Sequence, residues 1–551
     1  MSTYIASVID TTGIQKYIFG SNRLKENVAG SYLVKLATDD WVKECLRNLG
    51  NVYIPECNLS QAEPRINEDP EVIAELIYSG GGNTFLLFRD TEDNYARKFT
   101  ENWSKKILLE ASGLNVEIAH QPFDWNQRLL QDVIENDLIK GKLDIQKRNP
   151  RPSAPLLGLG VTVSCVSTGL VAVETRKIDG VMRPISREVV KKLAQVDNAN
   201  DELRKILFDD RKPRKRNEQY DIPLDVDDLG RSENESSYIA VVHIDGNQMG
   251  KRFEDYGKVQ SNSNKSIPDK NRDFVMAMRK LSWGVSEASR RALEAVGCAV
   301  IKLVDEEKFE IKDNYLPFRP IVYGGDDVTF VCDGRLGLSL AVKFLERFEE
   351  FTQDLPDGKG KATACAGIAI VKTHYPFSRA YALSESLCSQ AKQWMRQETN
   401  DYEKPLFSAI DWHIAASGLL GSIGEIRERE YRVQIPDLDK PASLTMRPMR
   451  SHSCPNQWRT WAGFSQVVND LNTHKDWKDR RNKVMALREV LRQGKKATEQ
   501  FRQAYSLESL PAFPEANSVL AKEGWYTDIC GYFDAIETMD FYTPLEESSN
   551  E

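Results

Sequence analysis

Two adjacent aspartates occupy the centre of residues 319–331, whose sequence is Arg-Pro-Ile-Val-Tyr-Gly-Gly-Asp-Asp-Val-Thr-Phe-Val. The apolar runs on either side predict a hairpin, with Gly324-Gly325 at its corner and Asp326-Asp327 at its tip. Adjacent carboxylates repel each other unless a cation lies between them. Because Mg²⁺ is usually held by one or two carboxylates plus phosphate oxygens, the pattern favours a metal–nucleotide site. The alternative is an exposed turn without chemistry.

A third carboxylate lies upstream, where the predicted strand 238–245 ends on Asp245. Asp245 and Asp326 on neighbouring strands can converge. With the backbone carbonyl of Ile244 they could hold two Mg²⁺ or Mn²⁺ ions. One ion would activate an attacking ribose 3′-hydroxyl, and the other would neutralise the triphosphate and the leaving pyrophosphate.

Candidate nucleotide-binding residues surround these carboxylates. The turn after Asp245 opens a helix, so its amide hydrogens could cradle phosphates. Lys392, on a predicted helix over 377–396, could add a positive charge to the phosphates, with a solvated helix lysine as the alternative. The predicted set is Gly246, Asn247, Gln248, Met249, Gly250, Gly324, Gly325 and Lys392.

The same order of elements occurs earlier in the chain. Strand 4–9 ends on Asp10, and a Gly-rich turn follows at Gly80-Gly81-Gly82-Asn83. The local sequences also agree, Tyr-Ile-Ala at 4–6 against Tyr-Ile-Ala at 238–240. We interpret this as an internal duplication with a period too long for a solenoid. Gly82-Asn83 stand where Asp326-Asp327 stand, so the first copy is predicted to be degenerate.

Other segments are predicted from their periodicity. A long helix is expected over 273–296, followed by a strand at 299–304. A Gly-punctuated strand is expected at 157–165. The run 211–216 holds five cations in six residues and predicts a solvated linker, with contact to nucleic acid as the alternative. After about residue 410 the pattern is helical.

Composition limits the class of protein. The 551 residues carry a formal net charge of −8 and a mean hydropathy of −0.49, which argues against a generally basic nucleic-acid binder. No run is apolar enough to span a membrane. The nine cysteines form no Cys-x-x-Cys pair, so we expect reduced thiols and a cytoplasmic protein without membrane contact.

Taken together, the motifs resemble those of a known family. The palm domain shared by GGDEF-type nucleotidyl cyclases and the large polymerase-cyclase subunit of type III CRISPR effector complexes has the same ordered set. That set here is Asp-Gly-Asn-Gln-Met-Gly at 245–250, Gly-Gly-Asp-Asp at 324–327, Ala-Gly-Ile-Ala at 366–369 and Ala-Lys at 391–392. The degenerate first copy and the stretches 14–19 and 24–33 favour the CRISPR subunit.

The resemblance implies an α+β fold with two ferredoxin-like palm domains, at 1–125 and 236–400. An intervening mixed domain with a charged linker would occupy 126–235, and an α-helical domain 401–551. It further implies that two ATP molecules are joined 3′–5′ into cyclic oligoadenylate, a second messenger of antiviral defence. Asp327 would support the two metal ions, and Ser31 in the first palm would help to shape the acceptor pocket. CRISPR RNA–protein subunits and target RNA are the implied partners.

Three departures from the family pattern qualify this reading. No His-Asp dyad of the family's nuclease domain is found among the six histidines, so we expect a form without that domain. Asn247 replaces the usual second acidic residue of the turn and adds no charge. Cys165 stands without the zinc-binding cluster. A nucleotide-binding scaffold without activity is the main alternative function, and a homodimeric cyclase using GTP is a weaker one.

Overall fold

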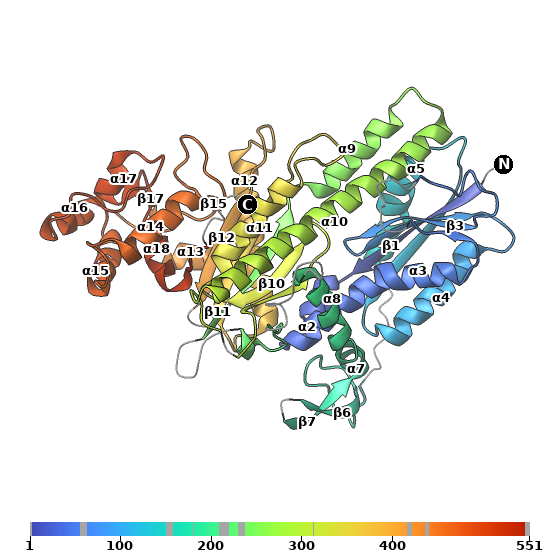
Figure 1. Cartoon of the computed structure of the whole chain (residues 1–551), viewed down its shortest axis with the longest axis horizontal. Coiled ribbons are helices and arrows are strands. Elements are labelled where there is room, and N and C mark those ends of the chain that lie inside the picture. The colour runs from blue at the N-terminus through green and yellow to red at the C-terminus, as the bar shows by residue number, and fades with distance from the viewer. Residues whose placement is uncertain are drawn as a thin grey trace.

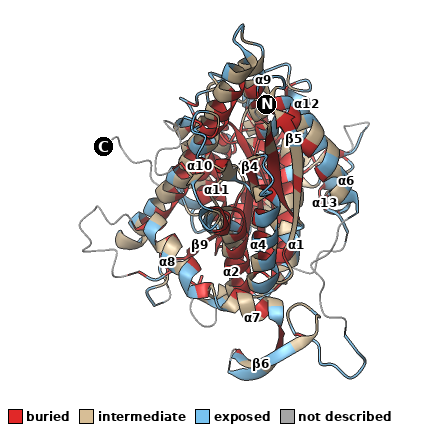
Figure 2. Ribbon diagram, turned by 90° about the vertical axis from the view of Figure 1, so that its right-hand side faces the viewer, coloured by how far each residue is buried: buried red, intermediate tan, exposed pale blue. Residues whose placement is uncertain are grey.

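The computed structural model describes residues 3–55, 63–149, 158–178, 180–208, 220–229, 237–311, 313–415, 421–435 and 440–545. Two α+β units lie side by side, and a mainly helical region extends from the second unit (Figure 1). The buried residues concentrate in the two sheets and their helical layers, whereas β6 is largely exposed (Figure 2).

The first palm is built on a five-stranded sheet in the order β2-β3-β4-β1-β5, with β1 antiparallel to both neighbours. Alternate residues of β1 face two separate cores. Ile9 faces the helices that lie between β1 and β5 in sequence, and Val8 faces the helical segment after β5. The strands are β1 Thr3–Thr12, β2 Val52–Tyr53, β3 Ala74–Gly80, β4 Asn83–Arg89 and β5 Asn115–Asp124. The helices are α1 Ile14–Phe19, α2 Leu24–Lys35, η1 Leu36–Asp40, α3 Trp41–Arg47, α4 Tyr95–Glu110, α5 Leu130–Asp132, η3 Val133–Leu143 and α6 Asp144–Arg148.

The second palm repeats this plan on a six-stranded sheet in the order β15-β12-β11-β8-β10-β9. β8 is again central and antiparallel to both neighbours. Its strands are β8 Tyr238–Gly246, β9 Phe318–Val322, β10 Val328–Asp333, β11 Ala364–Lys372, β12 Ala409–Ala415 and β15 Met449–Arg450. Its helices are α9 Met249–Ser261, α10 Ile267–Asp305, α11 Gly337–Phe351 and α12 Phe377–Glu398.

Helix α10 joins the two palms, because its first half packs on the first palm and its second half on the second (Figure 1). Arg279 of α10 is fully buried and pairs with Glu75 of β3, with 2.7 Å between Nη2 and Oε1. The same guanidinium donates hydrogen bonds to the carbonyls of Leu76 and Ile77. Removing one partner of a buried ion pair is strongly destabilising, so this contact fixes α10 on the first sheet.

A smaller unit follows the first palm. It consists of the hairpin β6 Ala172–Ile178 with β7 Val181–Ser186, then α7 Arg187–Leu193, α8 Val196–Leu207 and η4 Val226–Asp228. The predicted strand at 157–165 is wrong for its described part, 158–165, which contributes only an isolated bridge from Ser164 to Val171. Gly158 and Gly160 break this segment, and the neighbouring residues with fewer glycines form the strands instead. The basic run 211–216 lies outside the described residues.

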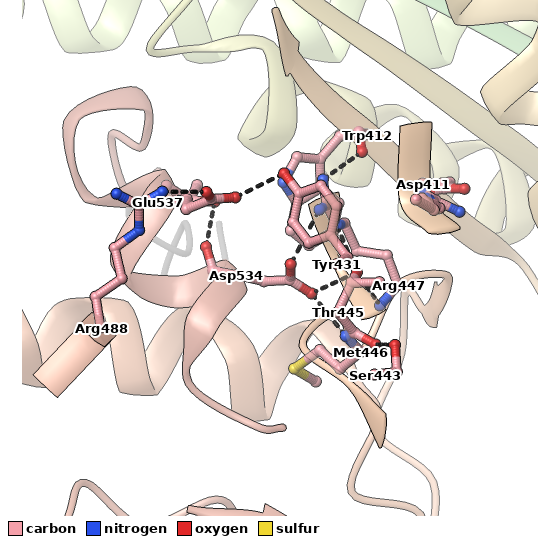
Figure 3. Close-up of polar contacts among 12 residues, drawn as sticks. Asp411, Trp412, Tyr431, Ser443, Thr445, Met446, Arg447, Arg488, Asp534 and Glu537 are labelled. Atoms are coloured by element: carbon pink, nitrogen blue, oxygen red, sulfur yellow. Dashed lines mark hydrogen bonds and ion pairs between the residues drawn. The ribbon is translucent and has the colours of Figure 1, made fainter. Parts of the chain in front are cut away.

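The C-terminal region contains short helices and a small sheet in the order β13-β14-β17-β16, which the helical prediction missed. Buried Arg447 ties this region to the second palm (Figure 3): its Nη1 donates to the Trp412 carbonyl at 2.6 Å, and its Nη2 lies 3.0 Å from Asp534 Oδ1. The strands are β13 Arg432–Val433, β14 Ala442–Ser443, β16 Trp525–Tyr526 and β17 Ile529–Cys530. The helices are α13 Ile423–Glu430, α14 Trp461–Thr473, α15 Arg481–Leu491, α16 Lys495–Ala504, α17 Ser518–Glu523, α18 Phe533–Thr538 and η5 Met539–Phe541.

The predicted strand at 299–304 is wrong, because α10 continues to Asp305. Val296, Val300 and Leu303 are buried at helical spacing, so the helix already covers the sheet with this run. A short β-branched run is ambiguous by itself, and the periodicity before it decides the outcome.

The structural units do not end at the predicted boundaries. The segment 130–148 covers the first sheet, and β12 extends the second sheet beyond residue 400. None of the described helices is long and apolar enough to cross a bilayer.

Candidate active site between the two palms

The predicted hairpin is present, since β9 and β10 pair antiparallel on either side of Gly324–Asp327. Val328 pairs with Ile244, so the next position along the ladder places Asp327 opposite Asp245. The backbone N–H of Gly246 donates to the carbonyl of Asp326 at 3.2 Å. The structure therefore brings the three predicted carboxylates to one edge of the second sheet.

The carboxylates influence one another. Burial raises the pKa of Asp326, and the nearby charge of Asp245 adds to the effect. Burial, followed by the charges of Asp245 and Asp326, raises the pKa of Asp327 to about 8. Like charges that disfavour ionisation in this way are what a divalent cation would relieve.

Lys392 reaches this edge from α12, as the sequence suggested. Its Nζ lies 2.6 Å from Asp245 Oδ2 and donates to the carbonyl of Gly246 at 2.9 Å. The lysine is therefore a residue of the site and not a solvated helix lysine. Its predicted contact with phosphate stays a prediction.

The turn after Asp245 differs from the predicted phosphate cradle in two positions. The N–H of Gly246 bonds Asp326, and the N–H of Asn247 donates to the Thr363 carbonyl at 2.8 Å. The Asn247 side chain also points into the fold, where its Nδ2 donates to Thr363 Oγ1 at 2.9 Å. Gly246 and Asn247 thus hold the turn in place, and the helix start at Gln248–Gly250 is the part left to face a ligand.

Gly246 is required by close packing. A Cβ on this residue would meet the Cβ of Asp326 at 2.9 Å and the Cγ of Met249 at 2.6 Å. Gln248 follows with φ of 54° and begins α9. The short side chain at 246 therefore lets the hairpin carboxylate approach the strand end.

A cavity of about 420 Å³ lies between the palms and reaches the carboxylate edge. Both Gly-rich turns line it: Gly80 and Gly81 from the first palm, and Gly324, Gly325 and Asp326 from the second. The two turns lie close together, because a Cβ added to Gly325 would lie 3.9 Å from the Cα of Gly81. Its apolar wall contains Tyr78, Phe85, Met249, Phe253, Phe274 and Met278.

Helix α10 lies across both turns. Ser286 donates a hydrogen bond from Oγ to the carbonyl of Gly324 at 2.8 Å, and Ser282, one helical turn earlier, lies beside Gly80. Both serines line the cavity. No local pattern of residues pointed to this role, because serines on a long helix are usually solvated.

Two predicted residues have no observed contact that tests their role. Ser31 is half-buried on α2 and is absent from the lining of the cavity between the palms. Ile244 lies in the ladder between β10 and β11 with a fully buried side chain. A metal bond from its carbonyl stays a prediction.

The fit of divalent ions can be judged from the donor set. In the described part of the chain, no three His, Cys, Asp or Glu side chains are gathered into a ready-made metal site. Asp327 nevertheless has an enclosed Oδ1 with no hydrogen-bond partner, in a side chain that is 48% exposed overall. Hard carboxylate oxygens with raised pKa values fit Mg²⁺ or Mn²⁺ once Lys392 leaves Asp245.

The first palm shows the same geometry without the carboxylates. Asp10 pairs with Asn83, and the N–H of Thr11 donates to the carbonyl of Gly82 at 3.2 Å. Thr11 and Gly82 thus match Gly246 and Asp326, so Gly82 and Asn83 occupy the ladder positions of Asp326 and Asp327. This register makes Tyr4 the equivalent of Ile239, so the matching Tyr-Ile-Ala triplets are offset by one residue and face opposite sides of the sheet.

Comparison with known proteins agrees with this architecture. Residues 238–400 match the family model described as Cas10/Cmr2, second palm domain. No curated protein matches the chain by sequence. Residues 238–400 are therefore similar to the second palm domain of Cas10/Cmr2, as the motifs implied.

Solved structures share the fold. Csm1 from T. onnurineus matches with 15% identity and a TM-score of 0.50, covering 98% of this chain and 70% of that one. Csm1 in the Csm1–Csm4 cassette with pppApApA matches with 14% identity and a TM-score of 0.50, covering 97% and 69%. In the cassette with cA4 the match has 15% identity and a TM-score of 0.40, covers 71% of this chain, and spans only 53% of the other chain.

Proposed function

We propose that this chain, whose residues 238–400 match the second palm domain of Cas10/Cmr2, is a nucleotidyltransferase that joins ATP through 3′–5′ phosphodiester bonds and releases pyrophosphate. The product would be a cyclic oligoadenylate that acts as a second messenger in antiviral defence. The observation that carries the proposal is the edge formed by Asp245, Asp326 and Asp327, of which Asp326 lines a cavity between the two palms.

The three carboxylates are the groups that would hold two divalent ions. Such ions supply Lewis-acid charge at the attacking hydroxyl and at the leaving phosphate. Lys392 is placed to exchange its pairing with Asp245 for a nucleotide phosphate, since its ammonium is a mobile point charge. The start of α9, where Met249 and Gly250 line the cavity, adds amide donors and the positive end of the helix dipole.

The cavity suits a nucleoside. Its volume of about 420 Å³ and its aromatic and methionine walls offer an apolar surface to a base. The two glycine turns let backbone approach the ligand closely, because neither has a side chain in the way. The first palm would thus hold nucleotide next to the metal-binding edge without contributing carboxylates.

The likeness to Csm1 bound to pppApApA supports adenylate as the joined unit. That relative was crystallised as a Csm1–Csm4 cassette, which supports assembly of this chain with other CRISPR effector subunits.

A silent nucleotide-binding scaffold is the second candidate. The Lys392–Asp245 ion pair and the lack of a ready-made metal cluster among the described residues favour it. The adjacent carboxylates argue against it, because a scaffold gains nothing from groups that repel each other.

Incubation of the full chain with each labelled nucleoside triphosphate and Mg²⁺ or Mn²⁺ tests the proposal, alone and with CRISPR RNA subunits and target RNA. We expect cyclic product from ATP. The double variant Asp326→Ala with Asp327→Ala should give none while still binding ATP in the apolar cavity. Binding of ATP by the wild-type protein without turnover in any of these mixtures would establish the scaffold.

A further inference from the structure

His243 lies on β8 two residues before Asp245, so both side chains face the same side of the sheet. It pairs across the ladder with Thr329 of β10. Its Nδ1 lies 3.2 Å from Thr329 Oγ1 and 3.4 Å from Asp327 Oδ1. A buried histidine therefore stands directly behind one of the three carboxylates.

Asp327 has two unlike oxygens. Oδ1 is enclosed and has no hydrogen-bond partner in the described structure, and the His243 ring lies beside it, while the charge of Lys392 also acts on this carboxyl. The side chain as a whole is about half exposed, so its open part is the side of Oδ2. An enclosed carboxylate oxygen without a donor is costly, and a ring N–H at this distance can supply one.

Packing fixes the position of the ring. Tyr381 of α12 meets His243 edge-on with 5.6 Å between ring centroids. Phe19 of the first palm stacks on Tyr381 at 3.7 Å and an interplanar angle of 16°. The imidazole is thus held by both palms, and its Nδ1 can turn only slightly between Thr329 and Asp327.

The first palm supplies an internal comparison. The equivalents of His243 and Thr329 are Val8 and Phe85, which pair with each other in the same register and are buried. The copy without hairpin carboxylates therefore also lacks the polar pair behind them. A histidine that only filled the core would have no reason to accompany the carboxylates.

We infer that His243 is a positioning residue, whose Nδ1–H holds Oδ1 of Asp327 and thereby turns Oδ2 toward the metal-binding edge. When the carboxylate moves away, the hydroxyl oxygen of Thr329 accepts the hydrogen bond from the same Nδ1–H. Active-site hydrogen bonds are often long before the ligand binds and tighten in the complex, which fits the 3.4 Å separation. The inference rests on the proposed function, because it concerns the same carboxylates.

Substitutions at 243 separate hydrogen bonding from packing. In His243→Asn the amide nitrogen is attached to Cγ, as Nδ1 is, and can replace the donor. In His243→Gln the nitrogen is one bond farther away, and His243→Phe keeps the ring against Tyr381 but has no donor. Outer partners of metal ligands typically change metal affinity by about 10–100-fold. We expect Gln and Phe to weaken Mn²⁺ binding about 10-fold and Asn to stay within about 3-fold of the wild type.

The measurement is a titration of the full-length chain with Mn²⁺ alone, followed by electron paramagnetic resonance of the free ion, with thermal unfolding of each variant as the check on folding. Turnover of the Gln variant should recover at saturating Mn²⁺, which damage to the fold would not allow. Thr329→Val, which removes the competing acceptor, should retain or increase the affinity.

The outcomes distinguish the two proposals. Equal Mn²⁺ affinity for the Phe, Gln and wild-type proteins, with wild-type synthesis intact, overturns the role of His243 and leaves the proposed function standing. The role of His243 is also overturned if the His243→Asn variant binds Mn²⁺ no more tightly than the His243→Gln variant. Absence of Mn²⁺ binding and of synthesis in the wild type overturns both.

Discussion

The two palms share the order of four strands, β3-β4-β1-β5 and β9-β10-β8-β11, yet their hairpin tips differ in both residues and backbone. In the first palm, Gly81 and Gly82 have φ of 59° and 82° and join β3 to β4 directly, as in a two-residue type I′ turn. In the second palm only Gly324 has positive φ, and a longer connection carries Asp326 and Asp327 in ordinary conformations.

The glycine at this contact also lies on a different strand in each palm. A Cβ on Gly82 would meet Thr11 Oγ1 at 2.6 Å, whereas in the second palm the strand position is Gly246 and the hairpin position is Asp326. Glycine and the larger side chain are thus exchanged across the same backbone hydrogen bond. The first palm therefore lacks the hairpin carboxylates and also lacks the room for a carboxylate side chain at Gly82.

Both palms keep the aspartate at the end of the central strand and pair it with a lysine. Asp10 contacts Lys147 of α6, and Asp245 contacts Lys392 of α12. No hairpin carboxylate accompanies the first ion pair, although Glu117 of β5 lies opposite Asp10 in the ladder, whereas Asp326 and Asp327 accompany the second. The comparison teaches that one strand-end aspartate is compatible with a structural role and that the hairpin makes the site.

The largest expected effect separates the two aspartates. Asp245→Asn should lower oligoadenylate synthesis about 1000-fold, the size expected when charge stabilisation of the transition state is removed. Asp10→Asn, the matched change, should keep the rate of synthesis within about 3-fold of the wild type, since no hairpin carboxylate lies opposite that residue. Rates are measured with labelled ATP at saturating Mg²⁺. A loss of similar size in both variants would show that the first palm also takes part in the chemistry.

The connection between the palms should dominate stability. Arg279→Met leaves Glu75 buried without its partner, so we expect the free energy of unfolding to fall by about 3–5 kcal/mol. Lys35→Met breaks a partly exposed pair with Glu202 and should cost less than about 1 kcal/mol. Urea unfolding followed by tryptophan fluorescence measures both. If Arg279→Met and the wild-type protein unfold at the same urea concentration, α10 is held on the first sheet by its apolar face alone.

The exchange of small residues is tested at Gly246. Gly246→Ala places a methyl group against Asp326, and we expect synthesis to fall about 100-fold, as misplacement of a reacting group by about 1 Å can produce. Gly82→Ala in the first palm should destabilise the chain by about 1–2 kcal/mol through its positive φ and yet leave turnover nearly intact. Turnover and unfolding temperature are recorded for both. The comparison fails if Gly82→Ala is the more damaging to synthesis.

The smallest effect concerns the serines of α10. Ser286→Ala removes a hydrogen bond to Gly324, worth about 0.5–1.5 kcal/mol, and should lower kcat about 5-fold by loosening the active hairpin. Ser282→Ala, beside the first hairpin, should change kcat less than 2-fold, about the effect of losing a weak contact. Steady-state kinetics with ATP give both values. Identical effects would indicate that α10 supports the two turns equally.

Much of the site could be predicted because it is local in sequence. The Gly-Gly-Asp-Asp tip, the strand-end Asp245 and the eroded copy at Gly82-Asn83 are each read from a few neighbouring residues. The matching triplets at 4–6 and 238–240 were misleading, because a one-residue offset in a strand reverses every side chain. The strand at 299–304 failed because a short apolar run does not specify its own period.

Local sequence alone identifies the residues that can do chemistry here, the carboxylates and the hairpin that carries two of them. It also shows the duplication, in which only the second copy has hairpin carboxylates. The tertiary structure alone decided what surrounds them. Lys392 on Asp245, Asn247 turned into the fold, His243 behind Asp327 and α10 across both turns come from elements far apart in the chain. Such contacts depend on how helices pack on the two sheets, and no local pattern of residues encodes that packing.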